Sequence, residues 1–269
     1  MSDNSTTFVG NVPEIYDREL GPIIFVDFAQ AMAHRVAGFA PQHVLETCAG
    51  TGIVTRRLRD LLLADATLTV TDLNPPMLEV ARSKFTAGER LGFQPADAMA
   101  LPFPDQSFDA VVCQFGVMFF PDKAKSYREA HRVLKPGGRY LFSVWDAHRF
   151  NPFARLGHGL VTELFPTDPP QFYQVPFGYH RLDPIKDAVT EAGFTRLKIE
   201  VLSREQAIVD VAAFAQGFVY GNPLAEQIRA RGGDPDAVVA ALTEIYRREF
   251  GADPGRMPMQ AIFFEAVRP

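Results

Sequence analysis

Cysteine is scarce in this chain of 269 residues, which contains only Cys48 and Cys113. Two thiols are too few for a disulfide framework or a thiolate metal cage, so zinc-finger classes are excluded and a reducing cytoplasm is expected. The sequence also lacks an apolar run near the roughly 18 residues that a membrane span needs. Its longest candidate, Gly21 to Ala33, is interrupted by Asp27 and Gln30. We therefore expect a cytoplasmic protein with no stable membrane insertion and no metal site.

The sequence also lacks an excess of positive charge and a recognisable leader. Lys and Arg number 27 against 32 Asp and Glu, which gives a net charge of −5. A phosphate-rich partner would meet a mildly repulsive average field, so no nucleic-acid partner is expected. The opening MSDNSTTFVGNVPE has neither a basic region nor an apolar core, so no secretory signal is expected. The 47% hydrophobic content fits a globular protein with a substantial core.

Parallel βα units are the expected architecture between residues 43 and 145. Short β-branched or aromatic runs alternate there with longer segments of helical spacing. The expected strands are His43–Thr47, Leu68–Asp72, Gly92–Pro95, Phe108–Gln114 and Arg139–Trp145. The expected helices are Ile53–Leu63, Pro76–Phe85 and Lys123–Leu134. The fold class is therefore α/β.

The flanking segments are expected to cover and complete this sheet. An amphipathic helix is predicted over Leu20–Ala37, and the loop-forming composition of Phe150–Tyr179 predicts a lid or lining segment that is mobile without ligand. The alternative is a static wall packed against helices in Val209–Phe250. The remaining predicted elements are a helix over Pro184–Ala192, a strand over Leu197–Leu202, mostly helix over Val209–Phe250 and a final strand over Ala261–Val267.

No repeat, low-complexity tract or linker indicates an independent second domain. We expect one domain over residues 1–269, with four parts along the chain. These are an N-terminal helical cover (1–40), a cofactor-binding core (41–147), a lid or substrate segment (148–182), and the remaining sheet with a helical insertion (183–269).

The turn after the expected first strand is the most informative feature of the sequence. The strand breaks into Gly50 and Gly52 just before a helix. Glycine lacks a Cβ and tolerates unusual dihedrals, so such a turn lets a ligand approach the backbone closely. Asp72 ends the second strand 20 positions after Gly52, where a carboxylate can accept two hydrogen bonds from ribose hydroxyls. The turn and the acid together predict a nucleotide-type site.

Two interpretations of this turn differ in glycine spacing: dinucleotide binding and S-adenosylmethionine binding. A G-x-G-x-x-G motif beginning at Gly50 requires a third glycine where Thr55 stands. The run VLETCAGTG, residues 44–52, instead resembles motif I of the class I S-adenosylmethionine-dependent methyltransferases, typically V-L-D-x-G-x-G-x-G. Glu46 stands at the acidic position, and Cys48 replaces the first glycine.

The resemblance continues through three later segments. VTDLNPPML, residues 70–78, looks like the family's second-strand acid and helix-opening segment. ADAMALPFPDQSFD, residues 96–109, is similar to G-D-A-x-x-L-P-F-x-D-x-S-F-D, and RVLKPGGR, residues 132–139, is similar to the turn into the fifth strand. The matches cover about Val44 to Asp146. The chain thus resembles the methyltransferase type 11 group, which includes small-molecule methyltransferases similar to those of ubiquinone and menaquinone biosynthesis.

The resemblance implies S-adenosylmethionine as cofactor and a role for each matched residue. Glu46 would anchor the methionine amino end, the turn would line the methionine and ribose, and Asp72 would take the ribose hydroxyls. Asp97 would accept from the adenine amine beside the Ala98 amide. The implied cofactor-binding residues are Glu46, Cys48, Ala49, Gly50, Gly52, Asp72, Leu73, Met77, Asp97, Ala98, Gln114 and Phe115.

Several of these residues also have a purely structural explanation. Glu46 is also explained as an acid that caps the loop, and Met77 and Leu73, which would sandwich the adenine, are equally explained as core. Gln114 and Phe115 are expected beside the methyl group. Gln114 is also explained as a polar residue at the end of a strand whose hydrogen bonds are made within the protein.

Tyr16 and three histidines are further candidates. Tyr16 precedes the predicted N-terminal helix, where its hydroxyl would close over the methionine carboxylate unless the ring is simply packed. His148, His158 and His180 lie in or next to the lid segment, and a histidine that titrates near neutrality is a candidate general base. No partner for any of them is readable from sequence.

The resemblance implies a Rossmann-like sheet of seven mostly parallel strands and an enzyme that transfers a methyl group in line. The segment after the fourth strand lacks the D/N-P-P-Y/F motif of amino-methylation, so a small-molecule acceptor is favoured. An apolar or aromatic acceptor is expected because aromatic residues concentrate late in the chain: Phe150, Phe153, Phe165, Phe172, Tyr173, Phe177, Tyr179, Phe214, Phe218 and Tyr220. The alternatives are an NAD-dependent oxidoreductase and a non-catalytic S-adenosylmethionine-binding module, and a homodimer is left open.

Overall fold

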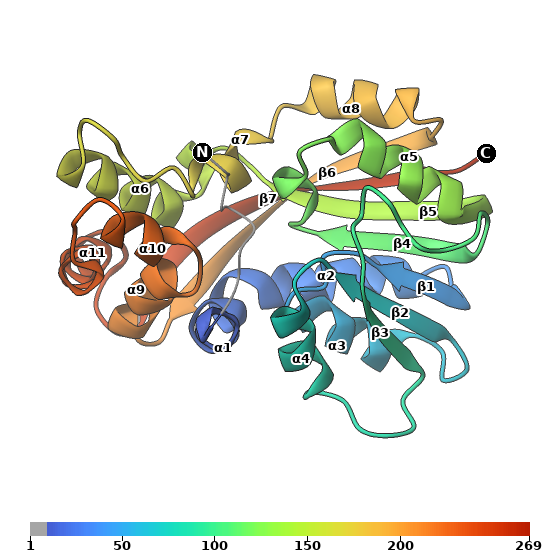
Figure 1. The fold of residues 1–269 in the computed structure, drawn as a ribbon, viewed down its shortest axis with the longest axis horizontal. Coiled ribbons are helices and arrows are strands. Elements are labelled where there is room, and N and C mark those ends of the chain that lie inside the picture. The colour runs from blue at the N-terminus through green and yellow to red at the C-terminus, as the bar shows by residue number, and fades with distance from the viewer. Residues whose placement is uncertain (1–9) are drawn as a thin grey trace.

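A seven-stranded sheet forms the centre of the computed structural model, which describes residues 10–269 (Figure 1). The strand order is β3-β2-β1-β4-β5-β7-β6. The strands are β1 (His43–Glu46), β2 (Thr67–Asp72), β3 (Leu91–Pro95), β4 (Phe108–Gln114), β5 (Leu134–Trp145), β6 (Thr195–Ile208) and β7 (Gly255–Val267). Residues 1–9, which carry most of the stretch searched for a secretory signal, lie outside the described residues.

The pairing confirms the predicted Rossmann-like sheet. β1 to β5 pair in parallel, and β7 runs antiparallel between β5 and β6. Glu46, the last residue of β1, pairs with Val70 of β2 and Val112 of β4. The strand order reverses between β1 and β4, and in open α/β sheets the crevice at such a reversal, outside the carboxyl ends of the strands, is where ligands bind. The expected site residues at the ends of β1, β2 and β4 therefore share one edge.

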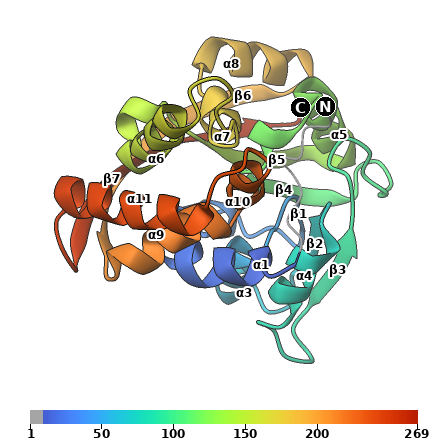
Figure 2. The same cartoon turned by 60° about the vertical axis from the view of Figure 1, so that its left-hand side comes forward.

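Helices cover both faces of the sheet and gather at one end. On one face lie α2 (Val26–Ala37), α3 (Ile53–Leu61) and α4 (Pro75–Arg82), and on the other α5 (Lys123–Val133) and α8 (Leu182–Glu191) (Figure 1). α6 (Pro152–Leu164), α9 (Val211–Tyr220), α10 (Leu224–Arg229) and α11 (Pro235–Phe250) gather at the carboxyl ends of the parallel strands (Figures 1 and 2). This helical group closes the end of the molecule where the site is expected.

The N-terminal helix begins earlier than predicted. α1 (Val12–Ile15) continues into a π-helix, η1 (Tyr16–Phe25), and then into α2, so the predicted start at Leu20 was wrong. Pro22 lies inside η1 and has no amide hydrogen to donate, which interferes with regular α-helical bonding. Tyr16 consequently lies within the helical segment and not ahead of it.

The prediction of a loop over Phe150–Tyr179 was wrong for much of its length. The segment contains α6 and a short helix, α7 (Gln174–Gly178). Pro152 occupies the first turn of α6, and Phe153, Gly157 and Val161 repeat at four-residue spacing on its buried face. The Gly and Pro content that suggested a loop instead provides a helix start and close packing.

Packing of α6 favours the static-wall alternative over a mobile lid. A Cβ at Gly157 would stand 2.2 Å from the Phe218 ring of α9, so only glycine allows this approach. Tyr173 stacks on Phe218 with ring centroids 3.9 Å apart, and Tyr246 of α11 donates a hydrogen bond to the Phe153 carbonyl. α6 is therefore fixed to the helical group.

Strand boundaries late in the chain also differ from prediction. β6 and β7 pair from Thr195–Val267 to Ile208–Gly255, about twice the length predicted for each. Charged residues such as Arg204 and Glu205 concealed the second half of β6 because they interrupt its apolar pattern. No helix within residues 10–269 is long and apolar enough to cross a membrane.

Candidate active site

The loop after β1 is a left-handed turn that opens to one side. Cys48, Gly50 and Gly52 have φ values of +54°, +55° and +79°. Apart from its two chain neighbours, no atom of residues 10–269 lies within 4 Å of the point where a Cβ of Gly50 would stand, whereas a Cβ of Gly52 would stand 2.9 Å from the Ala81 Cβ of α4. Gly50 thus leaves room for a ligand, and Gly52 lets α4 pack against the turn.

Asp72 is held against this turn. Its Oδ2 accepts a hydrogen bond of 2.8 Å from the Gly50 amide, and its Oδ1 accepts one of 2.8 Å from the Asn74 amide. Burial raises the pKa of Asp72, while the hydrogen bonds from Asn74 and Gly50 act in the opposite direction. The next side chain, Leu73, is apolar and 57% exposed. An exposed leucine beside a fixed carboxylate fits a ribose with a flat ring lying over it.

The candidate adenine residues have different environments. Asp97 Oδ1 accepts a hydrogen bond of 2.8 Å from the Met99 amide, and Ala98 is buried beside it. Met77 is buried, in contrast to Leu73. Leu73 is thus available to cover a ring, whereas Met77 packs as part of the protein interior.

Two buried acceptor atoms, Glu46 Oε2 on β1 and Gln114 Oε1 on β4, have no hydrogen-bond partner among the described residues, while Thr55 of α3 interacts with the Glu46 carboxyl and partly offsets the effect of its burial. Glu46 is only 2% exposed, and burial raises its pKa to about 8. Buried polar atoms are normally satisfied, so these oxygens call for a donor from outside the chain. An amino acid ammonium supplies three N–H donors and a positive charge. The residues at this edge therefore fit the methionine end of S-adenosylmethionine.

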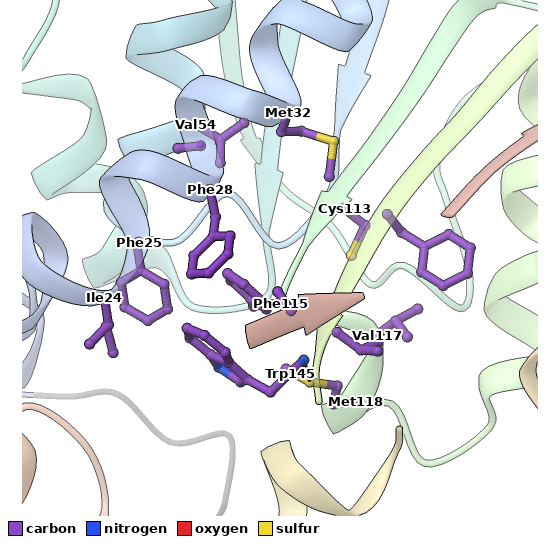
Figure 3. Close-up of a cluster of buried hydrophobic side chains, with 14 of the residues drawn as sticks. Ile24, Phe25, Phe28, Met32, Val54, Cys113, Phe115, Val117, Met118 and Trp145 are labelled. Atoms are coloured by element: carbon purple, nitrogen blue, oxygen red, sulfur yellow. Dashed lines mark hydrogen bonds between the residues drawn. The ribbon is translucent and has the colours of Figure 1, made fainter. Parts of the chain in front are cut away.

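An aromatic cavity adjoins the turn at the ends of β4 and β5. Phe115, at φ +53°, stacks on Trp145 with centroids 4.1 Å apart, and Phe25 packs against both (Figure 3). The cavity has a volume of about 70 Å³. It is lined by Tyr16, Leu20, Ile24, Phe25, Phe115, Met118, Phe119, Trp145, Phe153, Phe172, Tyr173, Pro176, Phe177 and Asn222. No charged side chain is in this lining within residues 10–269.

Polar atoms of the cavity are largely committed to the protein. Tyr173 donates a hydrogen bond of 3.1 Å to the Phe218 carbonyl, and Asn222 Nδ2 donates one of 2.9 Å to the Tyr173 oxygen. Tyr16 stacks on Phe25 at 5.1 Å, and burial raises its pKa well above the ordinary value. The cavity is thus suited to an uncharged, flat ligand.

The three candidate histidines do not line the cavity. His148 Nε2 lies 3.2 Å from the Tyr173 carbonyl, and its ring packs on Phe177 at 4.9 Å and on His158 at 5.8 Å. His180 Nδ1 lies 2.8 Å from the Phe177 carbonyl. Burial lowers the pKa of His148 and of His158. The structure therefore brings His148 and His158 to each other and not to the cavity.

Sequence reasoning missed several cavity residues. Phe153, Phe172, Tyr173 and Phe177 were among the aromatic candidates, but Trp145, Phe25, Met118 and Asn222 were not. Trp145 carried a usable signal, because a large aromatic residue ends a predicted strand at the carboxyl edge. No sequence pattern marked Asn222, because only its contact with the distant Tyr173 brings it to the cavity.

The fold and this edge define the class I S-adenosylmethionine-dependent methyltransferases. Residues 45–142 match the family model described as a methyltransferase domain. A ubiquinone/menaquinone biosynthesis C-methyltransferase of Proteus mirabilis is 32% identical over 172 residues, 58% of this chain and 67% of that protein. A demethylmenaquinone methyltransferase of Thermus thermophilus is 45% identical over 127 residues, 47% of this chain and 55% of that protein. The chain therefore belongs to the S-adenosylmethionine-dependent methyltransferases, and S-adenosylmethionine is its cofactor.

Solved structures agree in fold. The YcgJ protein of Bacillus subtilis aligns with a TM-score of 0.60 at 20% identity, covering 90% of this chain and 98% of that one. A Haemonchus contortus phosphoethanolamine N-methyltransferase in complex with S-adenosyl-L-methionine aligns with a TM-score of 0.60 at 21% identity, covering 96% of this chain and 56% of that one. The chain spans between 55% and 67% of the length of the curated relatives described above. The family match covers residues 45–142, and only Phe115, Met118 and Phe119 of the cavity lining lie within it.

Proposed function

We propose that this enzyme methylates a ring carbon of a small, uncharged, electron-rich aromatic molecule of the hydroquinone class. The observation that carries the proposal is the aromatic cavity beside the glycine turn, whose lining has no charged side chain within residues 10–269. The name of the Proteus mirabilis relative refers to C-methylation in ubiquinone and menaquinone biosynthesis, and that of the Thermus thermophilus relative to demethylmenaquinone; both support the same acceptor class.

The proposed cofactor position follows the expected residues. Glu46 and Gln114 hold the methionine end, because Oε2 of Glu46 and Oε1 of Gln114 are buried without a partner within residues 10–269. Asp72 takes the ribose hydroxyls at the turn, and Leu73 and Asp97 receive the adenine. Phe115 then separates the methyl group from the cavity core.

The chain's own contribution to the chemistry is alignment and exclusion of water. When bound, S-adenosylmethionine supplies a methyl group already activated by the sulfonium charge. The Phe115–Trp145 stack offers a flat surface that orients an aromatic acceptor, and the apolar walls keep water away. No carboxylate or histidine lines the cavity within residues 10–269, so the acceptor must be nucleophilic by itself. A hydroquinone meets this condition because its hydroxyl groups activate the neighbouring ring carbons.

The test is methyl transfer to a panel of acceptors. Uncharged alkylated hydroquinones should be methylated, while analogues that carry a carboxylate or an ammonium should be poor acceptors because the cavity cannot satisfy their charge. NAD should not bind. Absence of transfer to every aromatic acceptor, with S-adenosylmethionine binding intact, would favour the non-catalytic binding module.

Matched variants locate the acceptor. Trp145→Leu removes half of the aromatic stack, whereas Phe150→Leu removes a 37% exposed aromatic outside the cavity. We expect Trp145→Leu to lower kcat/KM for the acceptor by roughly two- to tenfold with little change in S-adenosylhomocysteine affinity, since an aromatic contact contributes about 0.5–1.5 kcal/mol beyond its buried area. Phe150→Leu should match the wild type. Equal kinetics of the two variants would remove the cavity from the proposal.

A further inference from the structure

The chain's two cysteines meet at the cofactor turn although they are 65 positions apart in sequence. A Cβ placed on Gly116 would stand 2.9 Å from the Cys48 sulfur and 2.8 Å from the Cys113 sulfur. Both sulfurs therefore flank one small space, which only glycine at position 116 leaves free. The two thiols are close enough for each to shift the pKa of the other.

The two thiols differ in exposure and in acidity. Cys48 is partly exposed on the turn, whereas Cys113 is buried in β4, within the same apolar cluster as Phe115 and Val117 (Figure 3). The pKa of Cys113 is lowered, chiefly by the hydrogen bond from Cys48, and the pKa of Cys48 is raised. Cys48 is the more accessible of the two, so peroxide reaches it first, and Cys113, whose lowered pKa increases its thiolate character, supplies the attacking sulfur of the second step.

We propose that Cys48 and Cys113 form a peroxide-oxidisable dithiol site whose disulfide weakens cofactor binding. The proposal depends on the placement of the cofactor at the glycine turn but not on the identity of the acceptor. It also explains the use of cysteine, in a left-handed backbone conformation, at the position where the motif I pattern has glycine.

The oxidation proceeds in two balanced steps. The Cys48 sulfur attacks one oxygen of hydrogen peroxide, the O–O bond breaks, and Cys48 sulfenic acid and water form. The Cys113 thiolate then attacks the Cys48 sulfur, the S–S bond forms, and hydroxide leaves and takes up the proton released by Cys113. In total, two thiols lose two electrons, and one peroxide is reduced to two waters.

A disulfide here would distort the turn because the turn is anchored on both sides of Cys48. The Thr47 amide donates a hydrogen bond of 2.9 Å to Val112 of β4, and the Ala49 amide donates one of 3.0 Å to Thr71 of β2. Moving Cys48 toward β4 would strain the hydrogen bond from the Ala49 amide to Thr71. The displacement would also shift Gly50, which is the next residue of the turn. By reciprocity, a bound cofactor must oppose disulfide formation to the same degree.

The experiment treats the full chain with hydrogen peroxide, counts free thiols, measures intact mass, and titrates S-adenosylhomocysteine before and after. We expect both thiols to disappear together, the mass to fall by two hydrogen atoms, and the affinity to fall by about tenfold or more until a dithiol reductant restores it. Saturating S-adenosylhomocysteine should slow the loss of thiols. Because the chain has no other cysteine, every thiol signal belongs to this pair.

Cys113→Ser is the matched control. Peroxide should then leave Cys48 as a sulfenic acid that dimedone traps, with no loss of two hydrogen atoms. Stepwise oxygen addition to wild-type Cys48, while Cys113 stays reduced, would overturn the dithiol site. A disulfide that forms without any change in S-adenosylhomocysteine affinity would overturn its link to the cofactor. The thiol and mass measurements need no acceptor, so failure of the proposed function leaves their outcome readable.

Discussion

The carboxylate of Asp72 accepts a hydrogen bond of 2.8 Å from the backbone amide of Gly50. This contact joins the acid at the end of β2 to the glycine turn after β1 across 22 positions of sequence. Asp72 therefore has two tasks, to hold the turn and to face the ribose. A test of the ribose role must separate them.

Asp72→Ala should weaken S-adenosylhomocysteine binding by roughly tenfold or more, because charge-assisted hydrogen bonds contribute about 1.5–3 kcal/mol. Titration calorimetry with S-adenosylhomocysteine and its 2′-deoxy analogue separates the two tasks. The wild type should prefer the parent compound, and the variant should bind both alike. An undiminished preference for the parent compound in Asp72→Ala would assign Asp72 to the turn alone.

Asp97 should tolerate amide replacement better than loss of its oxygens. Asp97→Asn still presents an oxygen to the adenine amine and to the Met99 amide, whereas Asp97→Leu presents none. We expect S-adenosylmethionine affinity to decrease in the order wild type, Asp97→Asn, Asp97→Leu. Equal affinities of the two variants in calorimetry would make Asp97 a purely structural residue.

Glu46 should make cofactor binding depend on pH. Its raised pKa, about 8, means that the carboxyl is mostly protonated at pH 7 before the cofactor binds. A bound ammonium favours the ionised form, so binding releases a proton, and affinity should rise with pH toward roughly tenfold per unit between about pH 6 and pH 7.5. Calorimetry in buffers of different ionisation enthalpy counts that proton.

Glu46→Gln is the control, because an amide has no proton to release. Its affinity should be lower and should vary little over the same pH range. The pH dependence of folding stability has the opposite sign. Because folding raises the pKa of Glu46 from 4.5 to about 8, its contribution to the free energy of unfolding is fully present below pH 4.5 and is lost as the pH rises through about 8. A wild-type binding curve that is flat with pH would contradict the proposed pairing.

α6 offers a stability test with an internal control. Gly157→Ala places a Cβ 2.2 Å from the Phe218 ring, whereas Gly159→Ala on the same helix meets nothing within 4 Å in the described part of the chain beyond its own helix backbone. Overpacking should cost Gly157→Ala about 1–3 kcal/mol, and Gly159→Ala should gain up to about 1 kcal/mol from helix propensity. Urea unfolding measures both. Equal stabilities of the two variants would mean that α6 is loosely attached, as the mobile-lid prediction required.

The strands and turns of the cofactor-binding half could be predicted from the sequence because they depend on local sequence patterns. Phe108–Gln114 was predicted with the observed bounds, and the strands that end at Glu46 and Asp72 were placed to within a residue or two, since each is an apolar run followed by turn chemistry. The structure of the half that contains α6 and the aromatic cavity could not be predicted in this way. α6 depends on the fit of Gly157 against Phe218, and the cavity on Asn222 meeting Tyr173, which are contacts between distant segments. The meeting of Cys48 and Cys113 was equally invisible, because it depends on the pairing of β1 with β4.

Methyl transfer from S-adenosylmethionine labelled with ¹³C in its methyl group identifies the acceptor atom. The enzyme, the labelled cofactor and an alkylated hydroquinone are incubated, and the product is read by NMR. We expect a labelled methyl group bonded to a ring carbon, at a rate that Trp145→Leu reduces and Phe150→Leu does not. A labelled methoxy or methylamino product, or transfer only to charged acceptors, would contradict this expectation.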